Sequence, residues 1–408
     1  MPDTTVTIGV VTALTPSTTT LAEYGLHLLA AFGRKPGVRV VALVEDDSEL
    51  DYPRIDGVEL VPAWRFNAVG NPIRLARAAR RANVDVVVLN AHFTSFGSSK
   101  VASALGLLAP LVLKTVGVPT ITLLHNIVET VDLRTAGFGP GGVMERVLRG
   151  IGSVVTWLVL RGDLVTTTMP RYVEILRTKY GASNVALTPH GAFEVPAPPS
   201  EPPTATQVMT FGKFGTYKRV EPLIEAIRML DRPGLELVVA GTDSPNTPGY
   251  LAQVATTHGG PDVRFIGYVP EGEVEATFRD ATVTVFPYTA TTGSSGVLHQ
   301  AGSFGCPPVL PRIGDLEDLI RDEGYTGSFF NPSDSADLAR AIDELLDSPE
   351  QRAAIAQKNY RAARGLAIDD VADWFLVHAG RLTSKGSRAF LAGPTEVRRR
   401  HDHSHSTL

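Results

Sequence analysis

The sequence predicts an α/β fold with two doubly wound domains, each built on a parallel sheet. Short apolar runs alternate with helical patterns through both halves of the chain, which is typical of strand–helix–strand units. Most of these runs are near-continuously apolar, as expected of parallel strands covered on both faces. The chain has 408 residues, and one hydrophobic core rarely extends over so many. Its composition, 43% hydrophobic and 20% charged, is that of a soluble globular protein.

In the first half, the predicted strands are short and rich in valine, isoleucine, leucine and threonine. They cover residues 7–11, 38–44, 84–89, 120–124, 164–168 and 185–188. Helical patterns at 21–32 and 71–83 fill two of the intervals between them. This order of elements predicts an N-terminal domain over residues 1–192.

A run of prolines interrupts the pattern at residues 193–206, which fit neither a helix interior nor a central strand and therefore predict a semi-rigid linker. A second alternation follows, with strands at 208–211, 235–240, 263–266, 283–286 and 307–310. We therefore predict a C-terminal domain over 207–362, a region at 363–383 whose helix (368–382) crosses back to the N-terminal domain, and a disordered tail at 384–408.

Charge and cysteine content exclude some classes of protein. The net charge of −5 gives no basic field to attract nucleic acid. A single cysteine, Cys306, excludes an intrachain disulfide and is typical of a reducing compartment. The chain enters its first strand without a basic leader, so we expect no signal peptide and a cytoplasmic location.

Two uncharged apolar runs, at 102–113 and 150–160, are shorter than the ~18–20 residues that a spanning helix needs. We interpret them as buried helices. The alternative is that they present an apolar face to the inner surface of the cell membrane, as a peripheral contact. Basic residues flank both runs and favour this alternative, whereas Glu145 and Asp163 dilute the charge; the basic residues are Lys100, Lys114, Arg146, Arg149 and Arg161.

Two glycine-bearing loops contain the most specific chemistry. Each follows a predicted strand and leads to a helix, the first at 212–219 and the second at 293–298. The first supplies the ammonium groups of Lys213 and Lys218 as point charges. The second supplies the hydroxyls of Ser294 and Ser295 and backbone N–H groups at a helix start, which is a favourable site for an anion. Together they can hold a diphosphate without a metal ion.

Five ordered segments in the second half resemble a known family. Phe211-Gly212-Lys213 with Lys218 resembles its diphosphate-gripping Gly-Arg…Lys-Gly element. The segment at 238–242 resembles its strand-and-glycine turn, and the segment at 265–269 resembles its base-contacting Phe-x-Gly-x-Val. The segment at 293–307 resembles its loop-helix with a Glu-x7-Glu pattern, and the segment at 327–346 resembles its closing segment. The family is the GT-B glycosyltransferases, specifically the retaining family-4 group, also called glycosyl transferases group 1. Several ordered segments are more specific than one glycine loop.

The resemblance implies a GT-B fold, with two Rossmann-like domains that face a central cleft. It also implies that a nucleotide-sugar donor is bound in the second domain. The residues implied to bind it are Gly212, Lys213, Lys218, Tyr268, Val269, Thr292, Gly293, Ser294, Ser295, Gly296, Val297 and Gln300. Thr292 and Gln300 stand where the family has its two glutamates. Gln300 retains a donor and an acceptor for ribose hydroxyls, whereas Thr292 is short and neutral where the family's first glutamate contacts the hydroxyls of the donor sugar.

In the first half, the segment 123–126 resembles the family's strand that ends in a histidine on the acceptor side. His125 is therefore expected to hydrogen-bond the transferring sugar, and the alternative is that it satisfies a loop carbonyl. Asn90 and His92 follow another strand and are candidates to face the acceptor. His190 lies in a Pro-His-Gly turn that resembles the family's inter-domain turn, and we interpret it as a turn residue.

The sequence thus predicts a retaining glycosyltransferase that moves a sugar from a nucleotide diphosphate to a glycan, a lipid-linked sugar or a small molecule. His125, Lys213 and Lys218 are the expected catalytic residues, with no cofactor besides the donor and no metal. We interpret Asp46-Asp47 as a solvated turn rather than a metal site. The alternatives are a non-catalytic relative that acts through a partner and a sugar-nucleotide epimerase. The nucleotide base, the acceptor and the oligomeric state stay open.

Overall fold

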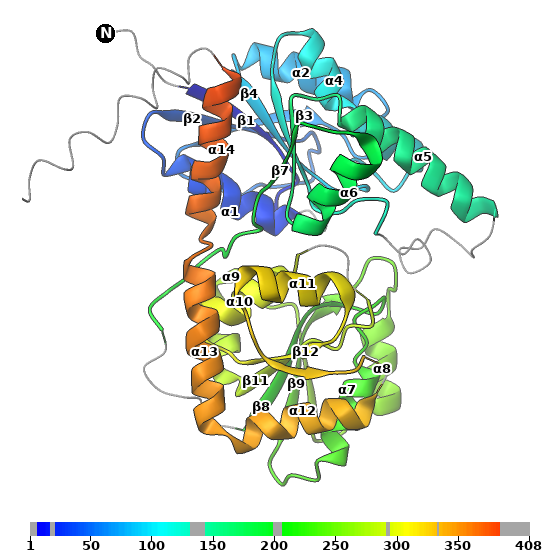
Figure 1. The fold of residues 1–408 in the computed structure, drawn as a ribbon, viewed down its shortest axis with the longest axis vertical. Helices are drawn as coiled ribbons and strands as arrows, with labels where there is room; N and C mark the ends of the chain where they lie inside the picture. The colour runs from blue at the N-terminus through cyan, green and yellow to red at the C-terminus, as the bar shows by residue number, and fades with distance from the viewer. Residues whose placement is uncertain are drawn as a thin grey trace, which may run out of the picture. The chain divides into compact units, whose positions relative to one another are not determined.

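The chain folds into two compact units (Figure 1). The computed structural model describes residues 6–16, 21–130, 143–198, 206–290, 294–332 and 334–383. Unit 1 takes its described residues from Met1–Ile127, Ile151–Thr188 and Asp369–Leu408, and unit 2 takes them from Val128–Gly150 and Pro189–Ile368. The described residues 128–130 and 143–150, which the sequence analysis placed in the N-terminal domain, are thus grouped with unit 2. The predicted tail at 384–408 and part of the predicted linker lie outside the described residues.

Unit 1 contains a seven-stranded parallel sheet in the order β3-β2-β1-β4-β5-β6-β7. The strands are β1 (Val6–Val11), β2 (Val38–Glu45), β3 (Val58–Trp64), β4 (Val86–Ala91), β5 (Thr120–Leu124), β6 (Leu164–Thr167) and β7 (Val185–Leu187). Helices that group with it wholly or in part are α1 (Ala22–Gly33), α2 (Asn71–Arg81), α3 (Lys100–Gly106), α4 (Ala109–Thr115), α5 (Val143–Val159), α6 (Pro170–Tyr180) and α14 (Ile368–Leu382).

Unit 2 repeats this plan with a six-stranded parallel sheet in the order β10-β9-β8-β11-β12-β13. The strands are β8 (Gln207–Phe214), β9 (Glu236–Asp243), β10 (Val263–Gly267), β11 (Val283–Val285), β12 (Pro308–Pro311) and β13 (Ser328–Phe330). The helices are α7 (Glu221–Met229), α8 (Tyr250–His258), α9 (Glu271–Asp280), α10 (Gly296–Ser303), α11 (Gly314–Glu323), α12 (Ser335–Asp347) and α13 (Pro349–Arg364). The two parallel sheets confirm the predicted fold class.

The central strands are buried because both faces of each sheet are covered. Every residue of β1, β4 and β5 is buried, as their uninterrupted apolar sequences predicted. In unit 2, the buried side chains of β8, β9 and β11 pack with those of α7 and α12 into one apolar cluster. The carboxyl ends of these strands are therefore held firmly, and the loops that follow them start from fixed positions.

The sequence prediction missed two edge strands, β3 and β13. Strand β3 contains Pro62, which cannot donate to a ladder and is tolerated here because β3 has a neighbour on one side only. Strand β13 spans only Ser328–Phe330, too short for a period to be recognised. Edge strands have weaker sequence patterns than buried central strands because one of their sides faces no partner.

Strand β8 is longer than predicted and changes the description of the first loop. The prediction ended this strand at residue 211, but β8 continues to Phe214, and Gly212, Lys213 and Phe214 pair with Gly241, Thr242 and Asp243 of β9. Gly212 and Lys213 are thus strand residues rather than loop residues, and the turn begins at Gly215. The position of Lys213 is consequently fixed by sheet pairing.

The interpretation as buried helices holds for most of the run at 102–113 and needs correction for the run at 150–160. The run at 102–113 forms two short helices, α3 and α4, because Pro110 favours a new helix start. The run at 150–160 belongs mostly to α5, which buries Thr156 and Val159 but exposes Ile151, Val154 and Trp157. No helix in the described part of the chain is long and apolar enough to cross a bilayer.

Helix α14 packs in unit 1 although it comes last in the described chain. Phe375 is fully buried, and its ring centroid lies 6.2 Å from that of Phe32 on α1. Ion pairs join Arg34 to Asp369 at 3.0 Å and Lys35 to Asp373 at 2.7 Å. These exposed ion pairs contribute little to stability compared with the buried aromatic contact.

We predict that Phe375→Ala lowers the free energy of unfolding by ~3–5 kcal/mol, because it leaves a cavity in the unit 1 core. Val377→Ala is the matched control: Val377 lies on the same helix but is 44% exposed, so its change should stay within about 0.5 kcal/mol. Urea denaturation followed by circular dichroism measures both. Equal effects of the two variants would contradict the packing of α14 described above.

Candidate functional site

The candidate site in unit 2 lies at the carboxyl ends of β8 and β11, where the strand order reverses. Along the sheet, chain order runs from β8 to β9 and β10 on one side and from β11 to β13 on the other. The loops after β8 and β11 therefore diverge in opposite directions, and this point of a doubly wound sheet is where ligands bind. The turn after β8 contains Lys218, and the loop after β11 leads to α10.

Lys218 brings the two loops together. It bridges to Tyr288 through the backbone, and its Nζ lies 4.6 Å from the centroid of the Tyr288 ring, in cation–π contact. A Cβ added to Gly212 would lie 2.9 Å from Lys218 Nζ and 3.9 Å from Val297 Cγ2. The ammonium therefore rests over the Gly212 backbone, close to the first turn of α10.

Glycine is required beneath this ammonium for a steric reason. Gly212 and Gly241 pair in register with φ of 134° and 137°, where side chains are disfavoured. A Cβ on Gly241 would lie 1.8 Å from Gly212 O, so the two backbones approach each other more closely than any other residue type permits. The space that Lys218 occupies above Gly212 exists only because that residue has no side chain.

The surroundings of Lys218 favour binding of an anion to its ammonium group. Among the described residues, no carboxylate forms an ion pair with Lys218. Desolvation in its aromatic surroundings lowers the pKa of the ammonium from its ordinary value. A bound diphosphate would supply the missing negative charge and favour the protonated form again.

The neighbouring Arg219 is engaged elsewhere. Its guanidinium is 2.8 Å from Glu221, at the start of α7, and Glu221 also accepts a hydrogen bond from the Tyr250 hydroxyl. The Tyr250 hydroxyl in turn accepts from the backbone N–H of Val220 at 2.8 Å. Arg219 thus helps to fix the start of α7, whereas Lys218 points its charge at the strand ends.

Helix α10 begins at Gly296 with Ser295 at its N-cap. The Ser295 side chain makes no capping hydrogen bond, and the N–H of Leu298 donates to Ser295 O at 3.0 Å, whereas the N–H groups of Gly296 and Val297 at the helix start have no acceptor within the helix. The predicted helix start is present and offers N–H donors, while binding of an anion there remains a prediction. Thr292 and Gly293, also predicted to contact the donor, lie outside the described residues.

A buried polar network supports the loop before α10, and the sequence analysis did not detect it. His299 Nε2 lies 3.2 Å from Ser294 Oγ, and His299 Nδ1 lies 2.8 Å from the Tyr325 hydroxyl. The His190 ring stacks on His299, with centroids 5.1 Å apart and planes at 6°. The sequence analysis missed this network because its residues are far apart in the chain. The turn role predicted for His190 is incomplete, because its ring also packs beneath Gly296.

Burial keeps this network neutral. Desolvation lowers the pKa of His190 to about 4 and holds that of His299 well below its ordinary value. Glu323 Oε2 lies 3.4 Å from His299 Nε2, and desolvation raises the pKa of this carboxyl to about 8. Ser294 is therefore held by uncharged groups.

The other residues predicted to bind the nucleotide-sugar donor lie in different environments. Gln300 lies on α10 and is buried, and Val269 is buried just after β10. Tyr268 is 71% exposed, which leaves its ring available to stack on a base. Lys213 is half-buried at the end of β8. Contact of these residues with a donor remains a prediction.

A second polar cluster lies at the carboxyl ends of β1, β4 and β5 in unit 1. His125 Nε2 is 2.7 Å from Asn90 Oδ1, and Asn90 Nδ2 donates to Thr12 Oγ1 at 3.0 Å. The His125 ring also meets the edge of Tyr24, with centroids 4.7 Å apart. Sheet order places β1 beside β4 and β4 beside β5, so this cluster marks the point where the strand order of unit 1 reverses.

His92 adds a hydrogen-bond donor to the same edge. The backbone N–H of Thr94 donates to His92 Nδ1 at 3.0 Å, and burial lowers the pKa of the ring to about 4. The neutral ring must therefore carry its proton on Nε2, which makes no hydrogen bond within the described structure. A small pocket surrounds it, lined by Val11, Thr12, Ala13, Leu21, Trp64, Asn90, His92, Ser95 and Phe96.

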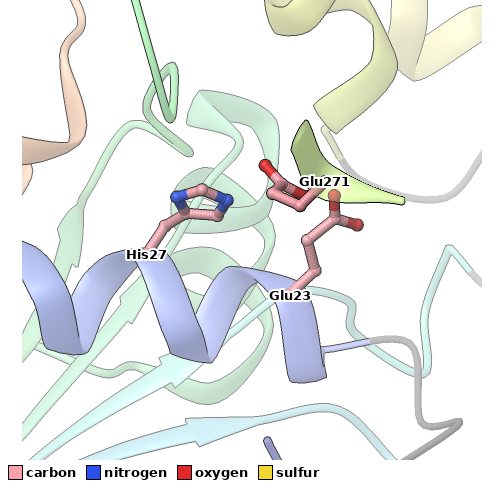
Figure 2. A group of neighbouring side chains, drawn as sticks. All are labelled: Glu23, His27 and Glu271. Carbon is pink, nitrogen blue, oxygen red and sulfur yellow. The ribbon is translucent and has the colours of Figure 1, made fainter. Parts of the chain in front are cut away.

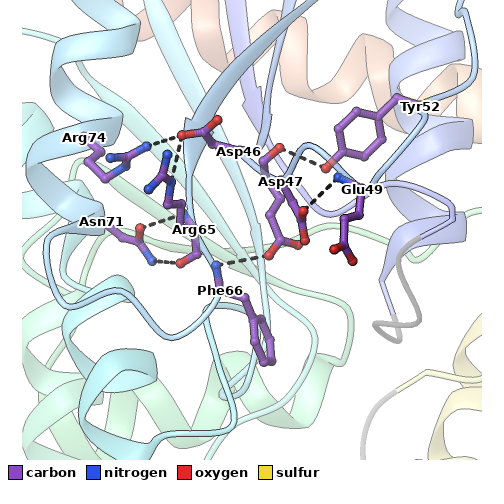
Figure 3. Close-up of polar contacts among 9 residues, drawn as sticks. Asp46, Asp47, Glu49, Tyr52, Arg65, Phe66, Asn71 and Arg74 are labelled. Atoms are coloured by element: carbon purple, nitrogen blue, oxygen red, sulfur yellow. Dashed lines mark hydrogen bonds and ion pairs between the residues drawn. The ribbon is translucent and has the colours of Figure 1, made fainter.

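The acidic pair that superficially resembles a metal site has other partners (Figure 3). Asp46 Oδ2 accepts from Arg65 at 2.9 Å and from Arg74 at 2.6 Å. Asp47 Oδ1 accepts from the backbone N–H of Glu49 at 3.0 Å. Both carboxylates thus order the loop between β2 and β3.

Figure 2 draws another set of potential metal ligands. Glu23 and His27 lie one turn apart on α1, and Glu271 is the first residue of α9. Because α1 belongs to unit 1 and α9 to unit 2, the three side chains define no single site.

Comparison with known proteins identifies the class. Residues 194–362 match the family model described as glycosyl transferases group 1. A glycogen synthase of Mycobacterium tuberculosis is 28% identical over 255 residues, 60% of this chain and 59% of that protein. A D-inositol 3-phosphate glycosyltransferase of Thermomonospora curvata is 31% identical over 186 residues, 43% of this chain and 42% of that protein. The alignments thus span about three fifths or less of these relatives.

Solved structures share the fold. A sucrose-phosphate synthase from Thermosynechococcus elongatus superposes with a TM-score of 0.69 at 16% identity, covering 95% of this chain and 100% of that one. The Anabaena protein HepE, in complex with UDP-glucose, gives 0.67 at 16% identity and covers 92% and 99%. The chain therefore has the GT-B fold, and its residues 194–362 form a glycosyl transferases group 1 domain. These findings confirm the predicted GT-B fold for the chain and the recognised family for residues 194–362.

We predict that Glu323→Gln flattens the pH dependence of stability between about pH 4.5 and 8. The folded state keeps the Glu323 proton up to about pH 8, whereas the unfolded carboxyl loses it near its ordinary value of 4.5, so the stability of the folded protein falls as pH rises through this window. Between about pH 6.5 and 8 the loss is up to ~2 kcal/mol, at ~1.36 kcal/mol per pH unit. Denaturation at several pH values measures it.

The control is Glu317→Gln, an exposed carboxyl on the same helix. It removes one negative charge without touching the buried network, so its pH profile should follow that of the unmodified chain. If Glu323→Gln and Glu317→Gln give the same slope, Glu323 is not protonated in the folded state.

Proposed function

We propose that this protein is a retaining glycosyltransferase that transfers a sugar from a nucleoside diphosphate to a sugar-containing acceptor. One observation supports this most strongly: the Lys218 ammonium rests on Gly212, without a carboxylate partner in the described structure, beside the start of α10. A cation and a helix N-terminus converge there, as a diphosphate requires. A polysaccharide or a cell-envelope glycan is the product class that we propose.

The chemistry at this site is electrostatic. Breaking the bond between the sugar and the diphosphate leaves negative charge on the departing phosphate, and Lys218 with the backbone N–H groups near Ser295 and Gly296 would stabilise that charge. Lys213 adds a second cation at the end of β8. In a retaining transfer, the departing phosphate oxygen takes the proton of the acceptor hydroxyl, so no separate base is needed. We propose no further cofactor and no metal ion.

UDP is the donor nucleotide that the structural neighbours favour, because HepE was solved with UDP-glucose. The exposed Tyr268 ring is a surface on which the base would stack. Gln300 would bind the ribose through its amide, in place of the family's glutamate. We inferred a cytoplasmic location from the single cysteine, and the protein would bind its UDP-sugar donor in that compartment.

The polar edge of unit 1 is the proposed acceptor site. His92 presents an Nε2–H donor, and the cluster of Thr12, Asn90 and His125 lies at the ends of neighbouring strands. Sugar hydroxyls both donate and accept, so they match this mixture of groups. In this proposal His125 orients the transferring sugar, with its ring fixed by Asn90 and Tyr24.

Lys218→Ala should weaken binding of the donor diphosphate by roughly 10- to 100-fold, which is the scale of one charged contact. Thermal shifts with UDP, GDP, ADP, TDP and their common sugar conjugates measure the change. At about 100-fold over its dissociation constant, a ligand adds ~2.7 kcal/mol, which gives a clear shift. Arg219→Gln is the control, because this neighbouring cation is already paired with Glu221.

A shift with one nucleotide that persists in Arg219→Gln and is lost in Lys218→Ala would support the site. Release of the nucleoside diphosphate from the sugar conjugate must then also occur. Binding of the sugar conjugate without release of the nucleoside diphosphate would favour a non-catalytic relative. The replacement of both family glutamates is the reason for considering that alternative. No shift with any nucleotide would overturn the proposed donor site.

Gly212→Ala should weaken nucleotide binding to a similar extent without removing any charge. Its Cβ would lie 2.9 Å from Lys218 Nζ and would occupy a backbone conformation with φ of 134°, so the ammonium must move. Gly272→Ala is the control, since a Cβ there meets no atom within 4 Å. Unchanged binding by Gly212→Ala would show that the position of Lys218 over this glycine is not needed.

A further inference from the structure

Helix α5 exposes an apolar stripe that no described residue covers. Its exposed side chains are Val147 at 49%, Ile151 at 54%, Val154 at 58% and Trp157 at 44%. Spacings of four, three and three residues place them on one face of the helix. Single exposed apolar residues are common on protein surfaces, but a row of this kind marks an interaction surface.

The exposed charged residues along the stripe are all of one sign. Between residues 145 and 161, every residue in the exposed class is apolar, glycine or arginine. The arginines are Arg146, next to Val147, and Arg161, whose guanidinium lies 4.3 Å from the Trp157 ring centroid. The exposed face of α5 therefore combines apolar and cationic groups and presents no carboxylate.

Lysines from neighbouring helices extend this cationic border. Lys114 of α4 donates to the backbone carbonyl of Arg161 at 3.2 Å, and Lys179 of α6 donates to Ser153 Oγ at 3.1 Å. The nearest carboxylates along the chain are engaged, Glu145 with Arg149 at 3.0 Å and Asp163 with Lys114 at 3.3 Å. The exposed ammonium of Lys179 thus lies against α5, and that of Lys114 lies against the turn that follows α5.

We propose that the α5 stripe is a docking surface for an anionic lipid bilayer, on which the helix lies in the plane of the interface. An apolar face bordered by Lys and Arg, with a Trp at its edge, matches the boundary between headgroups and acyl chains. Arg161 would lie over Trp157 and reach the phosphates with its charged end while its stem stays in the apolar layer. The helix has 17 residues and extends about 26 Å, so the stripe rests on the bilayer rather than crossing it.

Charge favours a bilayer over a second copy of the chain. A two-fold dimer would place this stripe against itself, and its cations against identical cations. The exposed residues of the stripe offer no carboxylate to compensate them. A surface of anionic lipid supplies negative charge along the whole border, at ~1 kcal/mol for each Lys or Arg near the surface.

Tryptophan fluorescence and sedimentation with vesicles test this proposal on the full chain. The chain has three tryptophans, of which Trp64 is buried and Trp374 on α14 is half-buried, so the part of the blue shift on adding phosphatidylglycerol vesicles that Trp157→Phe removes reports on Trp157. Trp157→Phe should lose that part of the shift and still sediment with the vesicles. Vesicles of phosphatidylcholine alone should bind more weakly, and ~1 M salt should release most of the protein, because it shortens the screening length to about 3 Å.

The variant Ile151→Ser/Val154→Ser should reduce partitioning into phosphatidylglycerol vesicles at least about tenfold. Because both side chains are exposed, the fold should be retained. The matched control is Met229→Ser/Val377→Ser, which removes two apolar side chains that are 57% and 44% exposed elsewhere on the surface. Arg146→Gln/Arg161→Gln should weaken binding to anionic vesicles and leave binding to phosphatidylcholine unchanged.

Three results would overturn the proposal: no sedimentation with anionic vesicles, equal binding by the stripe variant and its control, or a dimer in analytical ultracentrifugation that Ile151→Ser/Val154→Ser dissociates. The last result would assign the stripe to a second copy of the chain. None of these measurements uses sugar transfer, so their outcome is independent of the proposed enzymatic function.

Discussion

The candidate sites of both units depend on one constraint: parallel strands all end at the same edge of their sheet. In unit 1 the order reverses between β1 and β4, and in unit 2 between β8 and β11. At each reversal the following loops diverge, and polar groups from segments far apart in sequence meet at the strand ends. Thr12 and Asn90 meet there in unit 1, and Lys218 meets the start of α10 in unit 2. The buried apolar strands hold these positions fixed.

The electrostatics of unit 2 follow from burial as much as from charge. Desolvation keeps His190, His299 and Glu323 neutral, so the network beneath Ser294 can be buried without ion pairs. Lys218 sits in the same low-dielectric surroundings, where a charged interaction is stronger than in water. A diphosphate bound there would meet a cation already placed over Gly212, so little rearrangement would be needed on binding.

The surface of α5 follows a different rule from the strand ends. Its buried side, with Thr156 and Val159, is part of the folded protein, whereas its other side exposes apolar groups and arginines to solvent. Exposing a row of apolar side chains opposes the hydrophobic effect that stabilises the rest of the fold, which is why we assign it a partner. An acceptor linked to lipid would then be presented at the surface on which the protein rests.

The sequence by itself determined the class and the architecture. Uninterrupted apolar runs predicted the central parallel strands, and the ordered segments from Phe211 onward predicted the family, because both signals are local in the chain. Tertiary structure decided what local patterns do not contain. Sheet pairing extended β8 through Lys213, and the stacking of His190 on His299 joined residues far apart in sequence. The apolar run of α5 reads as a core helix in sequence, and only the packing around it shows which of its side chains remain exposed.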